Sequence, residues 1–282
     1  MKYSISNIAW AKEEDEEMYS FMEKNQIQAI EVAPSRLFGE RPYEKLEEAR
    51  QYALRLKEIY GIEIVSVQSI WYGRKENLFS SFQERNILKE YTRQAIQWSH
   101  EVGCENMVFG CPGNRKIGRK SNVGQIDSIA EEFFIQLGEY AAENGVVLAI
   151  EANPVQYGTD FLNTTKETAD FVEMVSSMGE PTNTLFGRGL GLNLDTGTML
   201  INGEDCCLIE REIAERISHV HISEPGLEKI EKREFHRELI SKLFRLGYNR
   251  CISIEMKNGE NLCTVQEAVL YLKGLVKGAE YE

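Results

Sequence analysis

Four residues that could bind a metal ion lie at the ends of short apolar segments in the second half of the chain. Glu151 follows VVLAI, Asp195 follows LGLNL, His221 follows ISHV, and Glu255 follows CISI. Three carboxylates and one imidazole suit a divalent cation, and hard oxygen donors favour Mn²⁺, Mg²⁺ or Co²⁺ over a structural Zn²⁺ site, which prefers thiolates. The pattern therefore predicts one mononuclear site, with Mn²⁺ as the first choice and Mg²⁺, Co²⁺ or Zn²⁺ as alternatives.

A divalent ion held in this way would suit proton transfer at the carbon next to a carbonyl group. The reaction needs a base near that carbon and an electrophile on the oxygen, which an ion chelating the carbonyl and the neighbouring hydroxyl would supply. Glu151 and Glu255 are the candidate bases, while Asp195 and His221 would act as ligands alone. Use of both glutamates would invert the carbon, as in an epimerase, and use of one face would give an isomerase.

The elements that must position these residues read as strands separated by helices. Apolar residues at three- and four-residue spacing indicate amphipathic helices over residues 13–26, 43–61, 84–103, 125–145 and 166–179. Between such helices lie eight short segments rich in Val, Ile and Leu, at 3–10, 29–33, 62–68, 106–110, 146–152, 190–195, 217–223 and 251–256. Eight units in 282 residues predict an α/β fold, a (β/α)8 TIM barrel with a single domain over 1–282. An open doubly wound sheet is the alternative, but no GxGxxG or Walker loop follows the first strand.

A barrel of this kind carries its active site at the carboxyl ends of the strands. Besides Glu31, this rule selects residues that are candidate substrate contacts, and we name six: Trp10, Gln68, Arg115, Asn153, Tyr157 and Glu224. Trp10 would offer an apolar wall to a substrate, and the forked guanidinium of Arg115 would suit a phosphate or carboxylate. Asn153 and Tyr157 could bind substrate hydroxyls, although an Asn before Pro also suits a turn.

His219 lies two residues before His221 and therefore on the same face of its strand, one layer deeper in the barrel. We interpret it as a buried, hydrogen-bonded core histidine rather than a second ligand. The six cysteines show no CxxC or zinc-ribbon spacing, so we expect free thiols in a reducing compartment.

Charge and hydropathy restrict the partners. The net charge is −13, from 45 acidic and 32 basic residues, so we expect no nucleic-acid partner; the segment 113–120 is the one local basic candidate. No apolar segment approaches the ~18 residues of a membrane span, and no secretory signal is visible at the start, so we expect a cytoplasmic protein with no membrane partner. We expect a small-molecule partner, and the sequence leaves a homo-oligomer open.

Five motifs resemble the xylose-isomerase-like superfamily of sugar and sugar-phosphate isomerases and epimerases. They are FGCPGNR, IEANPVQYGTDFLNT, NLDTGTM, HVHISEP and GYNRCISIEMK, at residues 109–115, 150–164, 193–199, 219–225 and 247–257. In ketose 3-epimerases and related members, a glutamate, an aspartate, a histidine and a second glutamate from strands five to eight hold one Mn²⁺ or similar ion. The resemblance implies that role for the same four residues that the strand ends select.

Two positions depart from that pattern. Many relatives carry D-x-x-H on strand six, where this chain has Thr198 three residues after Asp195, and those epimerases carry an arginine where this chain has Leu227. The resemblance therefore implies shared metal chemistry with different substrate contacts. Apurinic-site endonucleases of the same superfamily use three zinc ions and about nine ligands, mostly histidines, which the four histidines of this chain cannot supply.

Two other functions remain open at this point. A metal-dependent dehydratase acting on a polyol-derived ketone would use the same enediolate to expel a hydroxyl group, and would lose water irreversibly. A non-catalytic sugar-binding barrel is the third reading, against which the presence of both Glu151 and Glu255 argues.

Overall fold

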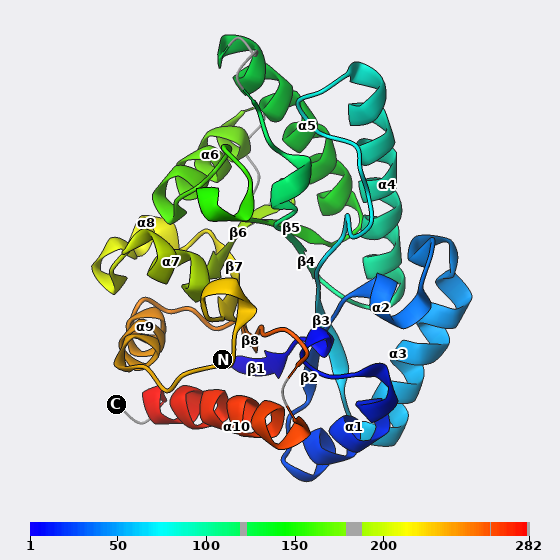
Figure 1. Cartoon of the computed structure of the whole chain (residues 1–282), viewed down its shortest axis with the longest axis vertical. Helices are drawn as coiled ribbons and strands as arrows, with labels where there is room; N and C mark the ends of the chain where they lie inside the picture. Colours follow the sequence, from blue (N-terminus) through cyan, green and yellow to red (C-terminus); the bar gives the residue numbers. More distant parts are fainter. Residues whose placement is uncertain (119–122, 179–187, 260, 281–282) are drawn as a thin grey trace.

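Eight parallel strands form a ring at the centre of the molecule, and helices surround it (Figure 1). The computed structural model describes residues 1–118, 123–178, 188–259 and 261–280. The strand order is β1-β8-β7-β6-β5-β4-β3-β2, so every strand lies beside its neighbour in sequence. A parallel bridge between Ser6 and Glu31 joins the two edges. The predicted (β/α)8 TIM barrel is confirmed.

Each of the eight predicted apolar segments coincides with or overlaps one strand. The strands are β1 (Lys2–Ile5), β2 (Ala29–Val32), β3 (Glu63–Val67), β4 (Asn106–Phe109), β5 (Val147–Glu151), β6 (Leu190–Asp195), β7 (Ile217–Ile222) and β8 (Cys251–Ile254). The prediction of a strand over 3–10 was too long, because the chain turns into a 3-10 helix at Asn7–Ala9. The Asn7 side chain accepts a hydrogen bond from the backbone of Ala33 at 2.8 Å, which ties this turn to the end of β2.

Helices follow the strands and cover the outside of the ring (Figure 1). They are α1 (Asp15–Lys24), α2 (Pro34–Phe38), α3 (Leu46–Tyr60), α4 (Phe82–Glu101), α5 (Val123–Glu143), α6 (Thr165–Ser177), α7 (Thr196–Asn202), α8 (Arg211–Ala214), α9 (Glu234–Arg245) and α10 (Leu262–Ala279). Ser81, Thr164 and Asn261 cap the first turns of α4, α6 and α10 with side-chain oxygens. Gly61 ends α3 in a left-handed conformation that suits a residue without a Cβ.

The interior of the barrel is polar, whereas the layer between strands and helices is apolar. Buried Leu, Ile, Val and Phe side chains fill the outer layer. Inside the ring lie hydrogen-bonded pairs such as Asn106 with Ser66, at 3.0 Å, and Ser4 with Ser253. A buried polar interior is stable only when its groups are paired, so these contacts constrain how the strands meet.

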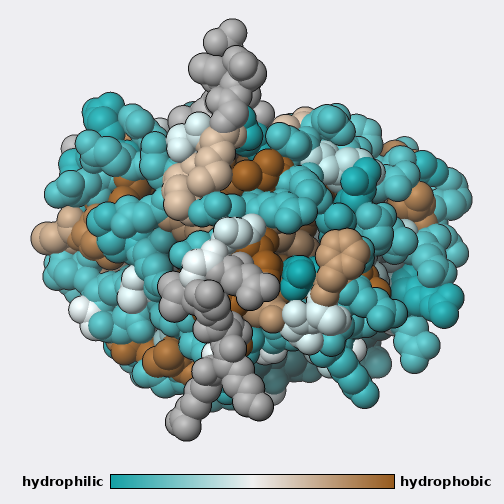
Figure 2. Space-filling view, turned by 90° about the horizontal axis from the view of Figure 1, so that it is seen from above, coloured by the Kyte–Doolittle hydropathy of each residue, from teal (hydrophilic) through white to brown (hydrophobic). Residues whose placement is uncertain are grey.

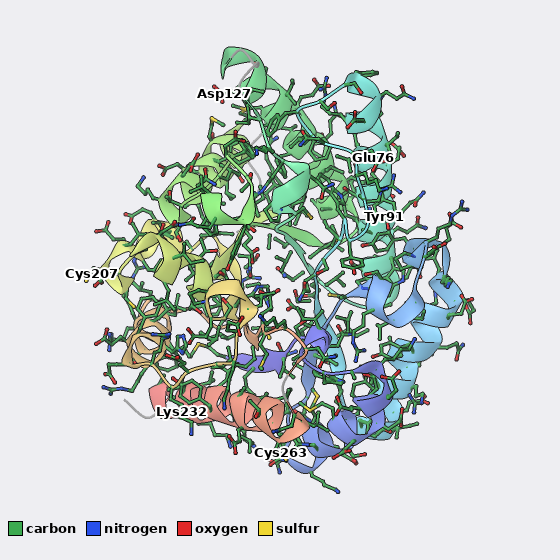
Figure 3. All side chains as sticks on the ribbon, in the orientation of Figure 1. Glu76, Tyr91, Asp127, Cys207, Lys232 and Cys263 are labelled. Atoms are coloured by element: carbon green, nitrogen blue, oxygen red, sulfur yellow. The ribbon has the colours of Figure 1, made fainter. Side chains whose placement is uncertain are left out.

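The outer surface is mostly hydrophilic on the face that Figure 2 shows, with apolar side chains in separate patches. All six cysteines are free thiols, as predicted, and Cys207 and Cys263 lie on the periphery (Figure 3). None of the described helices combines the length and the apolar character that a membrane span requires. The basic segment 113–120 lies partly outside the described residues.

Candidate metal centre

The carboxyl ends of β5 to β8 bring together the four residues that the sequence selects as ligands. Glu151, Asp195, His221 and Glu255 each offer an atom, and these atoms all lie within 4.8 Å of one another. The Nδ1 atom of His221 lies 3.2 Å from Glu151 Oε1 and 3.2 Å from Glu255 Oε2. Three carboxylates and an imidazole at this separation form a donor set that fits one divalent cation.

Strand register explains how residues so far apart in sequence meet. Asp195 of β6 is the register partner of His221 of β7, and Glu151 of β5 is the partner of Asn193. Asn193 lies two residues before Asp195, on the same face of the strand, and donates a hydrogen bond to Glu151 Oε1 at 2.6 Å. Asn193 was not predicted from the sequence, although its position two residues before Asp195 indicates that both side chains point to the same face of the strand.

Further hydrogen bonds fix the orientation of the carboxylates. Asn153 donates to Glu151 Oε2 at 3.0 Å. Asp195 accepts from the backbone N–H of Thr198 at 2.6 Å and from the hydroxyl of Ser223. These bonds limit the rotamers of both ligands before any ion binds, which lowers the entropy cost of assembling the site.

Gly110, just after β4, leaves the space that the Glu151 carboxylate occupies. A Cβ atom at this position would lie 2.7 Å from Glu151 Oε2, closer than side chains approach one another. The first glycine of the motif FGCPGNR therefore contributes to the site because it has no Cβ atom.

Charge crowding perturbs the titration of the candidate ligands. Burial, together with the neighbouring charge of Glu151, raises the pKa of Asp195 to about 6. Burial also raises the pKa of Glu255 to about 7. For His221, burial alone would lower the pKa, but the carboxylates of Glu31, Glu255 and Glu151 outweigh it and raise the pKa well above its ordinary value. Like charges held this close favour a cation between them.

A cavity of about 210 Å³ opens above the centre. Four of the six predicted substrate contacts line it: Gln68, Asn153, Tyr157 and Glu224. The Tyr157 hydroxyl accepts from the backbone N–H of Gly226 at 2.7 Å, and the Glu224 carboxylate is already paired with Arg233 at 2.7 Å. Thr198 and Leu227, the two positions that depart from the epimerase pattern, also line the cavity.

The other two predicted contacts, Trp10 and Arg115, do not line this cavity. Because β1 ends at Ile5, Trp10 lies beyond the strand end, where its Nε1 donates to Asp15 at 2.8 Å. Arg115 is fully buried and donates to the backbone carbonyl of Glu151 at 2.8 Å. Burial lowers the pKa of Arg115 to about 10. Neither side chain is among the residues that line the cavity, and direct contact with substrate stays a prediction for each.

His219 is fully buried one layer below His221, as predicted, and its assignment as a core histidine rather than a second ligand stays a prediction. Its Nε2 lies 3.1 Å from Glu31 Oε2 and 2.9 Å from the hydroxyl of Ser253. Burial lowers the pKa of His219, so the ring is neutral at neutral pH. Glu31 behaves differently: burial alone would raise its pKa, but the charge of His221 and hydrogen bonds from both histidines hold it well below the usual range.

Comparison with known proteins agrees with this architecture. The family described as xylose isomerase-like TIM barrel has a model that matches residues 21–275. A solved L-ribulose 3-epimerase is similar over 100% of this chain and 96% of its own, with 17% identity and a TM-score of 0.77. The 3-keto-D-glucoside 4-epimerase from E. coli is similar over 98% of both chains, with 15% identity and a TM-score of 0.75.

A third solved structure carries a metal ion. The IOLI protein, described with a bound zinc atom, is similar over 99% of this chain and 98% of its own, with 15% identity and a TM-score of 0.69. At these identities the likeness establishes a shared fold. A comparison of the sequence with curated proteins gives no match.

Proposed function

Since the chain belongs to the xylose isomerase-like TIM barrel family, we propose that it is a divalent-metal-dependent epimerase or isomerase of a sugar. The observation that carries the proposal is the meeting of Glu151 and Glu255 at His221 Nδ1, each at 3.2 Å. The two glutamates come from β5 and β8, the strands on either side of β6 and β7, so they can approach a bound sugar from two directions. The similar fold of solved sugar epimerases supports the same reaction class.

Glu151, Asp195, His221 and Glu255 would hold the ion. When bound, a divalent cation would polarise the carbonyl and the adjacent hydroxyl of the sugar and stabilise the negative charge that develops after proton removal. Mn²⁺ is our first choice, because three of the four donors are carboxylates.

The two glutamates differ in how firmly the protein holds them. Asn193 and Asn153 each donate to the Glu151 carboxylate, at 2.6 and 3.0 Å. Among the interactions of the described residues, the Glu255 side chain contacts only His221. A carboxylate with fewer donors is the better proton acceptor, so we assign proton removal to Glu255 and proton return to Glu151.

The cavity suits an uncharged sugar better than a sugar phosphate. Among the described residues that line it there is no lysine or arginine, and three lining residues are the candidate carboxylate ligands. Asn153, Gln68 and the hydroxyls of Tyr157 and Thr198 offer hydrogen bonds that suit sugar hydroxyls. Apart from the proposed metal ion, a phosphate would find no lysine or arginine partner among the described lining residues.

Incubation of the Mn²⁺-loaded protein in D₂O with a panel of free ketoses, and with their phosphates, tests the proposal. We expect deuterium at the carbon next to the carbonyl, in a product with otherwise unchanged mass, and a preference for the free sugars. Loss of one water per turnover would instead establish the dehydratase. Sugar binding without any exchange would leave a binding barrel and overturn the enzymatic proposal.

A further inference from the structure

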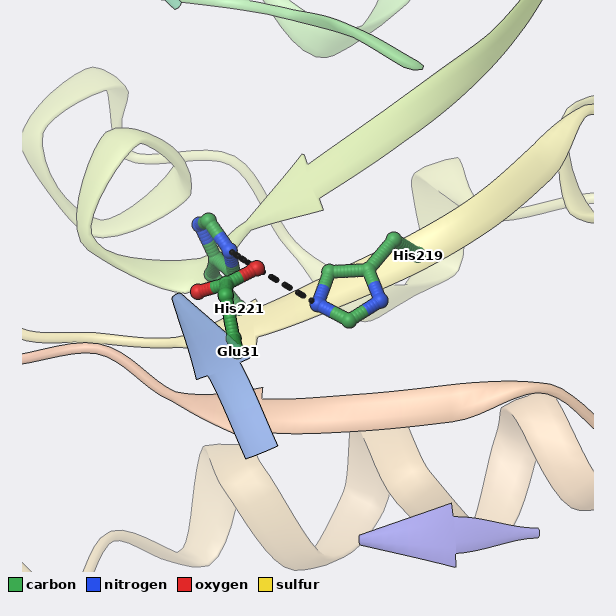
Figure 4. A group of neighbouring side chains, drawn as sticks. All are labelled: Glu31, His219 and His221. Atoms are coloured by element: carbon green, nitrogen blue, oxygen red, sulfur yellow. Dashed lines mark hydrogen bonds and ion pairs between the residues drawn. The ribbon is translucent and has the colours of Figure 1, made fainter. Parts of the chain in front are cut away.

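A second cluster of titratable groups lies directly beneath the metal centre, where Glu31 of β2 meets His219 and His221 of β7 (Figure 4). All three side chains are fully buried. A single oxygen, Glu31 Oε2, lies 3.0 Å from His221 Nε2 and 3.1 Å from His219 Nε2. The carboxylate therefore bridges two histidines from the layer below the cavity.

The two nitrogens of His221 face different partners as a result. Nδ1 points to Glu151 and Glu255, at 3.2 Å each, whereas Nε2 points to Glu31. An ionised carboxylate only accepts hydrogen bonds, so a bond to Glu31 requires the hydrogen on Nε2. In the neutral ring this leaves the lone pair on Nδ1, on the side of the candidate ligands.

Glu31 is itself held from below. His219 Nε2 also lies 2.9 Å from the Ser253 hydroxyl, which in turn contacts the hydroxyl of Ser4. Glu31 also forms the bridge with Ser6 that joins the two edges of the sheet. This residue is thus placed by β1, β2, β7 and β8 together, and its position is fixed when the barrel closes.

We propose that Glu31 is a positioning residue for the metal ligand His221, and that His219 keeps Glu31 in place. The proposal rests on the proposed metal site and adds to it a residue from the opposite side of the barrel. A carboxylate that accepts from the distal nitrogen of a ligating histidine fixes its ring and tautomer and raises its basicity, and loss of such a partner typically weakens metal binding about 10- to 100-fold.

Metal affinity, measured by isothermal titration with Mn²⁺, gives the first test. We expect Glu31→Leu, which removes the acceptor, to weaken binding by up to about 100-fold. Glu31→Gln keeps an acceptor oxygen and loses the charge, so we expect a smaller loss of about 10-fold. His219→Phe should weaken binding least, because Glu31 still contacts His221.

A matched control separates this effect from the general cost of changing a carboxylate. Glu204→Gln makes the same chemical change at a glutamate whose oxygen accepts from the backbone of Thr165 and lies near Asn202. We expect this variant to bind Mn²⁺ as the unmodified protein does. Circular dichroism checks the fold of each variant. If Glu31→Leu does not fold, the Mn²⁺ affinities of Glu31→Gln and His219→Phe test the proposal instead.

The second readout is the nitrogen-15 spectrum of the histidine rings in the Zn²⁺-loaded protein, where four histidines give few signals. We expect His221 with the metal on Nδ1 and the hydrogen on Nε2, and in Glu31→Leu a broadened or altered Nε2 signal. A role in packing alone would leave this signature unchanged.

The outcomes distinguish the two proposals. If the unmodified protein binds no ion, the metal site and this inference both fail. If it binds one ion, and the Glu31 variants keep its affinity and the His221 signature, the inference alone is overturned. Two ions per chain, one of them lost in Glu31→Gln, would show that Glu31 is a ligand and not a positioning residue.

Discussion

The two mouths of the barrel both carry charged side chains, but they arrange these side chains differently. At the amino ends of the strands, a cavity of about 710 Å³ is lined by residues that include Lys2, Lys57 and Glu63. At the carboxyl ends the cavity is about 210 Å³. The larger cavity holds opposite charges in pairs, with Lys57 at 3.1 Å and Lys2 at 3.5 Å from Glu63.

The carboxyl mouth has the reverse character. Glu151, Asp195 and Glu255 gather around one imidazole, and among the described residues that line this cavity no lysine or arginine compensates them. Paired surface charges are already satisfied, whereas like charges in a buried cluster are costly without a cation. The comparison shows that the two cavities differ in charge pairing, because Glu63 at the amino ends is paired with lysines, whereas the acidic groups at the carboxyl ends gather around one histidine.

The largest effect should come from Glu255→Gln. The amide can still coordinate a cation through its oxygen but cannot accept a proton at neutral pH, so we expect kcat to fall about 10²- to 10⁴-fold with little change in KM. Steady-state kinetics on the substrate found by deuterium exchange measure this. A turnover close to that of the unmodified protein would exclude Glu255 as the base and would weaken the contrast between the two mouths.

Gly110→Ala should have the next largest effect, because the new Cβ would lie 2.7 Å from Glu151 Oε2. We expect the displaced carboxylate to weaken Mn²⁺ binding by about 10-fold or more, the size typical of a disturbed ligand environment. Gly113→Ala is the matched control in the same loop, since its Cβ would meet no atom within 4 Å. Equal affinities in the two variants would mean that Glu151 does not need its observed position.

Arg115→Ala removes the hydrogen bond to the Glu151 backbone carbonyl, which also has a longer contact with Asn153 Nδ2, at 3.4 Å. We expect the free energy of unfolding to fall by about 1.5–3 kcal/mol, the contribution typical of a hydrogen bond from a charged group. Activity should fall equally on a free sugar and on its phosphate. A selective loss on the phosphate would instead support the sequence-based prediction that Arg115 contacts an anionic group.

Glu63→Gln at the amino mouth should have the smallest effect. Hydrogen bonding from Lys57 lowers the pKa of Glu63, despite an opposing effect of burial. Its contribution to stability is therefore present above the unfolded-state pKa of about 4.3 and is lost as the pH falls through the lower folded-state value. Because the pair is exposed, we expect a loss below about 1 kcal/mol at pH 7 and none at pH 2, with kcat unchanged. Denaturant unfolding at the two pH values measures this, and a large loss of activity would contradict the comparison.

The sequence by itself determined the fold and the identity of the four converging residues. Eight apolar segments alternating with amphipathic helices can bury their surfaces only as a parallel sheet covered by helices. In such a sheet the carboxyl ends of all strands lie at one edge, so residues such as Glu151 and Glu255 had to approach one another. The interpretation of His219 followed from the same alternation along β7.

Only the tertiary structure decided which of the predicted side chains line the cavity and which do not. Trp10 and Arg115 follow strands as Gln68 and Asn153 do, but the turn at Asn7–Ala9 and the fold of the loop after β4 take them away from the cavity. Glu31 and His221 are 190 residues apart in the chain, and their bond forms across the barrel interior. No local pattern encodes such a contact, because it depends on how the closed ring sets the stagger and depth of strands that are distant in sequence.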